Sequence, residues 1–443
     1  MSRLSSLALM LTAMAAALAA QQHPDIQLTV MGRSQEAPAL AVPDFRGDAQ
    51  SQPFMAAFNE TLWRDLDDSA DFNMVPKTHY PTAIPQQPSE LRLREWSAPP
   101  ANAAYLAMGY SGIANGTFVL RAWFMDVRSS TVATAQLFER RYGESPDAAG
   151  VRHAAHKFAA DILEKLGLPS LFGTHIYYVH ESRPAPDRQT EIWMMDFDGA
   201  NQRPIARGKS IFNFPSVSPD GSQLAFAKLF PAPELVRYSL ETARALPFQN
   251  QVGLSAVSAP SFTPDGKQIL FSQSEGRGMH IVVANPDGSN QRSLTGLTTT
   301  DVEPKVNPKT GAQIAFVSGR AGRQQIYLMN MDGFDVEHLS EGTGEASNPS
   351  WHPNGQFIAF AWTQGYAPGA WNIFVMDVAK RNYVQLTHGE GKNENPVWAP
   401  DGKHLVFMST RSGKPQIWSM TADGQQLRQL TTEGDNSTPT WGR

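Results

Sequence analysis

The chain has 443 residues, and its 37 Lys and Arg against 42 Asp and Glu give a net charge of −5. This length exceeds one ordinary hydrophobic core, so we expect two domains, and the near balance of charge argues against a nucleic-acid-binding surface. Cysteine is absent, which excludes disulfides, thiol catalysis and cysteine-based zinc sites.

The first twenty residues have the features of a secretory signal peptide. Arg3 supplies a positive charge, residues 4–18 form a short apolar run, and Ala17-Leu18-Ala19 is a small-x-small cleavage site. The run is too short to cross a bilayer comfortably. We therefore predict a cleavable signal over residues 1–20 and an exported mature chain without a membrane span. A buried N-terminal helix is the alternative.

Residues 21–170 predict a small α/β domain. Apolar residues recur every three or four positions between Phe54 and Leu66 and again between Val151 and Leu166, as in amphipathic helices. Gly167 and Pro169 end the second helix. Strands are expected at residues 26–30, 39–42, 72–75, 104–110, 117–126 and 131–140, with a tight hairpin at Asn115-Gly116.

No catalytic or metal-binding motif stands out in this domain. His153 and His156 lie three residues apart on the second helix, but no Glu or Cys completes a metal site and the HExxH pattern is missing. We interpret both as surface or cap-packing histidines. The stretch from Gly109 to Ile113 lacks the final glycine of a nucleophile elbow. We predict that the chain is not an enzyme.

Residues 174–443 contain six copies of one signature, which predict a β-propeller. The copies begin at prolines spaced by 45, 44, 45, 47 and 43 residues. A repeat of this length with β-type units is typical of one four-stranded blade. We call these residues the anchor prolines: Pro215, Pro260, Pro304, Pro349, Pro396 and Pro439.

The ends of this region predict how the ring closes. The last copy stops at Trp441, so no residues remain for its other three strands. Candidate strands precede the first copy, at residues 176–179, 191–196 and 202–205. The sixth blade should therefore be composite, which leaves no free sheet edge between the first and last blades. The predicted fold is a small α/β N-terminal domain followed by an all-β six-bladed β-propeller with a composite closing blade.

Acidic and amide residues gather just before the anchor prolines, at one mouth of the predicted channel. Converging charges reinforce one another, so the mouth is a candidate site for a cation or a basic partner segment; solvated loop residues are the alternative. Repeated Asp-Gly pairs such as Asp198-Gly199 are interpreted as turns, because their spacing fits no calcium motif. The candidate mouth residues are Asp301, Glu303, Glu345, Asn348, Glu394, Asn395 and Asp435.

The order of these parts resembles the TolB family of the Tol–Pal system. The most specific segments are residues 153–167, 176–179 and 192–199, together with the P-x-W-x-P-D-G repeats. The linker at residues 170–174 and the blade around Pro231 and Pro233 depart from the family pattern, which leaves partner contacts open.

The resemblance implies a monomeric periplasmic scaffold that needs no cofactor. It implies that the propeller mouth binds the lipoprotein Pal, that the mature N-terminal segment binds TolA, and that other outer-membrane proteins are further candidate partners. An exported propeller that binds a small ligand or an unrelated protein is the competing hypothesis. The residues implied for TolA binding are Gln21, Gln22, His23, Asp25, Ile26, Leu28 and Val30.

Overall fold

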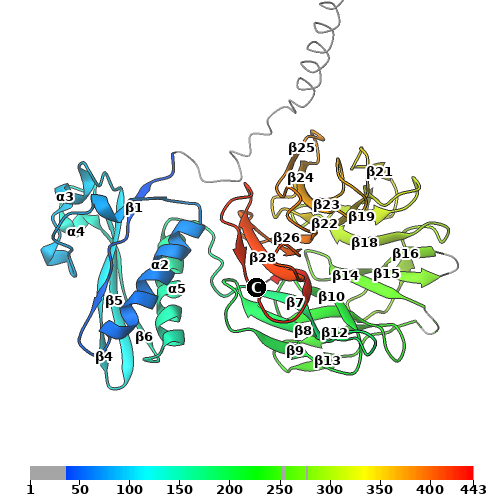
Figure 1. The fold of residues 1–443 in the computed structure, drawn as a ribbon, viewed down its shortest axis with the longest axis horizontal. Helices are drawn as coiled ribbons and strands as arrows, with labels where there is room; N and C mark the ends of the chain where they lie inside the picture. Colours follow the sequence, from blue (N-terminus) through cyan, green and yellow to red (C-terminus); the bar gives the residue numbers. More distant parts are fainter. Residues whose placement is uncertain (1–35, 252, 254, 276–277, 443) are drawn as a thin grey trace, which may run out of the picture.

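The computed structural model describes residues 36–442, except for 252, 254, 276 and 277. The predicted signal peptide, the strand at residues 26–30 and the predicted TolA-binding segment lie outside the described residues. The described chain folds into a small α/β domain and a β-propeller, which lie side by side in Figure 1. None of its helices in the described ranges combines the length and the apolar character that crossing a membrane requires.

The N-terminal domain is a mixed sheet with its two long helices on one face and the short helices α3 and α4 on the other. The sheet order is β3-β1-β4-β5-β6, and β2 pairs with β4. Helices α2 (Met55–Asp68) and α5 (Ala148–Lys165) pack on the sheet through a core that includes Phe58 and Phe158. In Figure 1 they lie between the sheet and the propeller. The other elements are β1 (Ala39–Ala41), β2 (Arg46–Gly47), η2 (Gln52–Phe54), β3 (Asn73–Met74), η3 (Lys77–His79), η4 (Pro88–Glu90), α3 (Leu93–Ser97), β4 (Tyr105–Ala114), β5 (Thr117–Asp126), α4 (Val132–Ala135) and β6 (Gln136–Glu144).

Local sequence explains most of these boundaries. The Asp147 carboxylate accepts a hydrogen bond from the Gly150 backbone N–H and begins α5, and Gly167 follows the helix with a φ of 71°. The hairpin predicted at Asn115-Gly116 is confirmed, with positive φ at both residues.

The strand expected at residues 131–140 was wrong in its first half. Thr131 and Thr134 exchange side-chain-to-backbone hydrogen bonds in a capping box, so α4 forms there and β6 begins only at Gln136. The two threonines thus form a helix cap instead of a strand.

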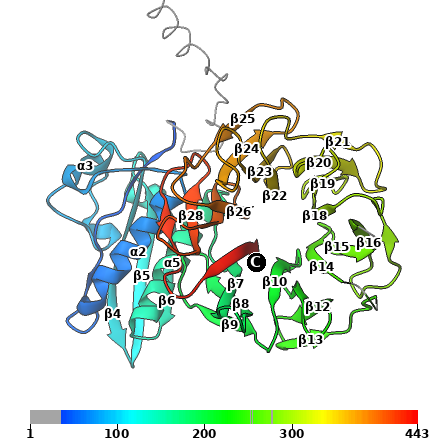
Figure 2. The ribbon, with the colours of Figure 1, turned by 45° about the vertical axis from the view of Figure 1, so that its right-hand side comes forward.

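Within the described residues the propeller has six four-stranded sheets, which form a ring in Figure 2. Blades 1 to 5 follow one another along the chain, each with its first strand innermost. Blade 1 is β10 (Phe212–Val217), β11 (Gln223–Lys228), β12 (Glu234–Ser239) and β13 (Arg244–Leu246); blade 2 is β14 (Val257–Phe262), β15 (Ile269–Glu275), β16 (Gly278–Ala284) and β17 (Arg292–Ser293); blade 3 is β18 (Asp301–Val306), β19 (Gln313–Ser318), β20 (Gln325–Asn330) and β21 (Glu337–His338); blade 4 is β22 (Ala346–Trp351), β23 (Phe357–Trp362), β24 (Asn372–Asp377) and β25 (Tyr383–Gln385); blade 5 is β26 (Asn393–Trp398), β27 (His404–Ser409), β28 (Gln416–Thr421) and β29 (Arg428–Gln429).

Blade 6 is composite, as predicted. Its innermost strand β30 (Asn436–Gly442) comes from the C-terminal end and pairs with β7 (His175–Arg183), which is followed by β8 (Gln189–Asp196) and β9 (Arg203–Ala206). Trp441 lies opposite Ile176, and its indole N–H donates to the Thr174 hydroxyl at 2.9 Å. The ring is thus closed by two segments from opposite ends of the domain.

Each innermost strand carries a β-bulge at its anchor proline. The strand register shifts at this point in all six blades. The residue before each anchor proline has a positive φ, between 41° and 57°. A bulge re-aims the side chain of the extra residue, and here it selects which side chains line the channel. These bulge residues are Phe214, Ala259, Glu303, Asn348, Asn395 and Thr438.

Candidate functional site

The central channel of the propeller contains a cavity. It encloses about 650 Å³ and is lined by the bulge residues, by the residues that follow the anchor prolines, and by tryptophans of blades 4 to 6. The lining is mostly neutral, and it includes one carboxylate and one ammonium group among the described residues. The lining side chains used below are Glu303, Lys305, Asn348, Ser350 and Asn395.

The bulge residues of blades 3 to 5 link neighbouring blades. The Glu303 carboxylate accepts hydrogen bonds from the Asn348 backbone N–H at 2.7 Å and from its side-chain amide at 3.1 Å. The Asn348 side-chain oxygen accepts in turn from the Asn395 backbone N–H at 3.2 Å. Burial raises the pKa of Glu303 above its usual range although these hydrogen bonds oppose the change. Three of the predicted site residues therefore do lie together, but Glu303 and Asn348 also hold the ring together.

Asp301 lies away from the channel, contrary to the expectation from its sequence position. It is fully buried, and its carboxylate forms an ion pair with the Arg320 guanidinium at 3.2 Å and accepts from the Thr299 hydroxyl at 2.9 Å. Arg320 in turn lies over the Phe316 and Tyr327 rings. Asp301 is the third residue before its anchor proline, and that position points into the blade.

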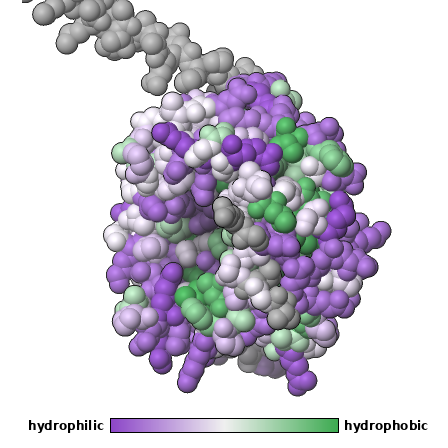
Figure 3. All heavy atoms as spheres, turned by 90° about the vertical axis from the view of Figure 1, so that its right-hand side faces the viewer, coloured by the Kyte–Doolittle hydropathy of each residue, from purple (hydrophilic) through white to green (hydrophobic). Residues whose placement is uncertain are grey.

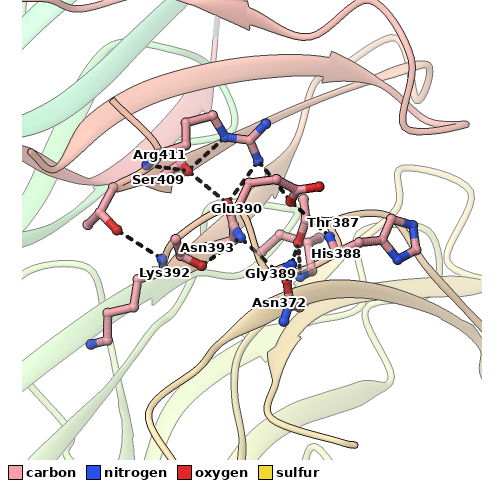
Figure 4. A network of polar contacts seen from close by, with 12 residues as sticks. Asn372, Thr387, His388, Gly389, Glu390, Lys392, Asn393, Ser409 and Arg411 are labelled. Carbon is pink, nitrogen blue, oxygen red and sulfur yellow. Dashed lines mark hydrogen bonds and ion pairs between the residues drawn. The ribbon is translucent and has the colours of Figure 1, made fainter. Parts of the chain in front are cut away.

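Blade 5 repeats this arrangement with a neutral acceptor. The Asn393 side-chain oxygen accepts from the Ser409 hydroxyl at 2.8 Å and from the Arg411 guanidinium at 3.0 Å, and Figure 4 shows this network. Arg411 lies over the Phe407 and Trp418 rings, as Arg320 lies over its own two rings. In blades 3 and 5 this position therefore supplies an oxygen acceptor for an arginine, and either Asp or Asn can provide it.

We expect Asp301→Ala to destabilise the protein by about 1–3 kcal/mol, because the fully buried carboxylate that pairs with Arg320 is lost. Asp301→Asn should cost well under half of that, because it restores the arrangement found at Asn393. Urea unfolding of the two variants measures the difference. Equal losses would show that the charge of Asp301, rather than its acceptor oxygen, stabilises this blade.

The remaining predicted carboxylates do not line the cavity. Glu345 and Asp435 occupy equivalent positions, four residues before their anchor prolines, are half-buried, and form no ion pair within the described part of the chain. Glu394 pairs with Lys392 at 3.3 Å. In the other blades the position of Glu345 holds Ile211, Ala256, Thr300 or Lys392. The mouth is therefore less acidic than the sequence suggested.

A charged cluster between the domains had not been predicted. The His156 side chain on α5 lies between two carboxylates, with Nδ1 2.5 Å from Asp65 on α2 and Nε2 3.4 Å from Asp198 in the turn after β8. All three side chains are buried, and Arg64 and Arg152 lie 3.9 and 3.8 Å from Asp198. Burial alone would lower the pKa of His156, but the hydrogen bonds and charges of Asp198 and Asp65 raise it to about 9.

This cluster corrects part of the interpretation of the two histidines. His153 is the surface residue that was expected, and it lies 3.0 Å from Glu144. His156 instead joins the domains. Asp198 was correctly interpreted as a turn residue, since its Oδ1 accepts from the Ala200 backbone N–H at 3.1 Å. Its second oxygen forms the contact that sequence reasoning missed.

Blade 5 adds further contacts to the same interface. Lys403 forms an ion pair with Asp71, just after α2, and donates to the Ser69 carbonyl at 3.3 Å. Beside this interface but within the propeller, the Arg428 guanidinium of blade 5 donates to the Asp198 backbone carbonyl of blade 6 at 2.6 Å. The N-terminal domain thus contacts both the composite blade and its neighbour. No group of three or more His, Asp or Glu side chains suited to a metal ion occurs among the residues that the structure describes.

Two family models match the chain. One is the TolB amino-terminal domain, over residues 26–132, and the other is the TolB beta propeller domain, over residues 163–366 and 337–443. The chain belongs to the TolB family. The two matches follow the order of the domains in the structure.

Individual relatives agree with this assignment. A protein TolB homolog from Chlorobium luteolum is 30% identical over 202 residues, which are 45% of this chain and only 44% of that protein. The Tol-Pal system protein TolB from Bordetella parapertussis is 27% identical over 335 residues, 75% of this chain and 71% of that one. The crystal structure of TolB from Acinetobacter baumannii has a TM-score of 0.74 at 22% identity, and the match covers 92% of this chain and 97% of that one. It shows that the two proteins share a fold.

Proposed function

We propose that the chain is a non-enzymatic, periplasmic scaffold of the Tol–Pal envelope system that supports outer-membrane integrity and constriction at division. The observation that carries this proposal is the family match over both domains, in the order that the fold displays. The name of the Bordetella relative points to the same system. In this proposal the protein acts as an exported monomer without a cofactor, and a cation in the channel remains a prediction.

Two regions would bind partners. The propeller mouth would bind Pal, with Glu345, Glu394 and Asp435 as charged contacts and Asn348 and Asn395 as hydrogen-bonding groups. The segment from Gln21 to Val30 would bind TolA, and other outer-membrane proteins would be further partners. The propeller face on the right of Figure 1 offers mainly hydrophilic side chains with apolar residues in small groups, as Figure 3 shows. Such a surface suits recognition by polar and charged contacts.

The proposed binding of Pal to the propeller mouth can be tested by reversing the charges of Glu345 and Asp435, which form no ion pair within the described residues. The double variant Glu345→Lys and Asp435→Lys should weaken Pal binding by more than tenfold, because it replaces two attractive groups by two repulsive ones at the same mouth. Titration calorimetry with purified Pal measures this. Glu241→Lys, an exposed reversal in the outer turn of blade 1, is the matched control and should bind normally. Equal affinities for all three proteins would remove the mouth from the proposal.

Capture from an envelope extract separates the scaffold from the competing hypotheses. The mature protein should retain Pal and TolA, and a form without residues 21–30 should retain Pal but lose TolA. Recovery of other proteins alone would favour an unrelated propeller module. Recovery of no protein would favour a small ligand.

A further inference from the structure

Lys305 is an unusual residue for its place in the channel. It follows the anchor proline of blade 3, where the other blades carry small uncharged side chains: Ser216, Ser261, Ser350, Val397 and Thr440. It is the one cationic side chain among the described residues that line the cavity. A single ammonium group therefore faces a channel that is otherwise lined by neutral groups and Glu303.

The Lys305 ammonium group has no hydrogen bond or ion pair with the described residues of the chain. Glu303 is the one carboxylate of the described lining, and its two oxygens already accept from the Asn348 backbone and side chain. Burial lowers the pKa of Lys305 although the charge of Glu303 opposes the change. An ammonium group carries three donors, and leaving them unpaired in a half-buried position is unfavourable. An anionic group in the channel would relieve this cost.

Neighbouring blades offer further donors to the same cavity. The Ser350 hydroxyl oxygen accepts from the Trp398 backbone N–H at 3.2 Å, so its own O–H is left to donate. The Asn395 side-chain amide makes no hydrogen bond with the described residues, whereas its backbone N–H is used by Asn348. Blades 3, 4 and 5 thus present an ammonium, a hydroxyl and an amide N–H to one space. Two acceptor oxygens on one planar group would match such donors.

We propose that the channel binds a carboxylate group, which pairs with Lys305 and accepts hydrogen bonds from Ser350 and Asn395. If the carboxylate belongs to an acidic side chain of a protein partner, the inference rests on the proposed function. That side chain would then bind inside the channel, in addition to the contacts that the partner makes at the mouth. A free small carboxylate would use the same three groups. The carboxylates at the mouth and Lys305 in the interior would then select different parts of one ligand.

The test uses the protein from residue 21 to 443 and two small probes, the N-acetylated amides of aspartate and of asparagine, which differ in charge but hardly in shape. Titration calorimetry should show binding of the aspartate probe with a dissociation constant of about 1 mM, and at least tenfold weaker binding of the asparagine probe. Lys305→Met should lose at least tenfold in affinity for the aspartate probe, whereas Lys305→Arg should keep most of it. Lys309→Met, which removes an exposed lysine next to the same strand, should bind normally.

Equal binding of both probes, no binding to the native protein, or an unchanged affinity of a folded Lys305→Met variant would overturn the proposal. Thermal unfolding of each variant confirms that it is folded. Pal titration then identifies the source of the carboxylate. A matching tenfold loss of Pal affinity in Lys305→Met indicates a side chain of the partner, and unchanged Pal affinity indicates a free carboxylate. Failure of the native protein to bind Pal would overturn the proposed function and leave the probe result intact.

Discussion

Removal of residues 436–443 should destabilise the propeller by about 5 kcal/mol or more, a large part of the stability of an ordinary domain. Residues 436–442 form β30, the innermost strand of blade 6, which pairs with β7 and packs against the first strands of blades 1 and 5. Without it, β7 becomes an exposed edge and the buried side chain of Trp441 is lost. The ring then has a gap between its last and first blades.

Calorimetry of the truncated protein checks this expectation. The propeller transition should shift to a much lower temperature, while the N-terminal domain, which has a core of its own, should keep a separate transition. The single substitution Trp441→Ala should by itself lower the stability of the propeller by about 3–5 kcal/mol. Leu427→Ala, at an exposed position in blade 5, is the control and should change little. Unchanged unfolding of the truncated chain would mean that β30 does not close the ring.

Stability should fall by about 3 kcal/mol as the pH rises from 6.5 through 9, because His156 loses its proton between two buried carboxylates. The pKa of His156 is about 9 in the folded protein against an ordinary value near 6.5, so the unfolded chain gives up this proton first. The stabilisation is therefore complete below pH 6.5 and is lost as the pH passes through 9. His156 joins the two domains through Asp65 and Asp198, so the same titration should loosen their contact.

Urea unfolding between pH 6 and 9.5 measures this dependence. His156→Asn should remove most of the slope and lower the stability at pH 6. His153→Asn, three residues away on the same helix but half exposed, should leave the slope unchanged. Small-angle scattering of His156→Asn should show a larger radius of gyration if the domains separate. If the stability of the native protein did not change between pH 6 and 9.5, this would contradict the assignment of a charged His156.

The propeller could be predicted because the same sequence signature occurs six times along the chain. Six anchor prolines at nearly constant spacing indicate six blades, and the incomplete last copy indicates a composite blade, which the pairing of β30 with β7 confirms. The ends of α5 could also be predicted, because the residues that cap this helix lie next to its ends in the sequence. The misplaced start of β6 came from Thr131 and Thr134, whose β-branched side chains suit a strand as well as a capping box.

The chemistry of the site was less predictable, because it depends on which way each side chain points. Asp301 and Glu303 are two residues apart in the sequence, yet the first pairs with Arg320 inside the blade and the second faces the channel. The bulge that separates them has no signature beyond the proline. The contact of His156 with Asp198 joins residues of different domains, and no local pattern reports it.

The hydrogen bonds between bulge residues are unevenly distributed around the pore. Glu303, Asn348 and Asn395 form a continuous series through blades 3, 4 and 5, whereas Phe214 of blade 1 and Ala259 of blade 2 have no side-chain acceptor to offer the next blade. Other side chains join those blades: the Ser272 hydroxyl accepts from the Glu303 backbone N–H at 3.2 Å, and the Thr438 hydroxyl donates to the Asn213 side-chain oxygen at 3.1 Å. The direct bonds between bulge residues thus lie in the same arc of the ring as Lys305, Ser350 and Asn395, so a guest bound by these three groups would rest against the part of the wall in which the bulges are tied to one another.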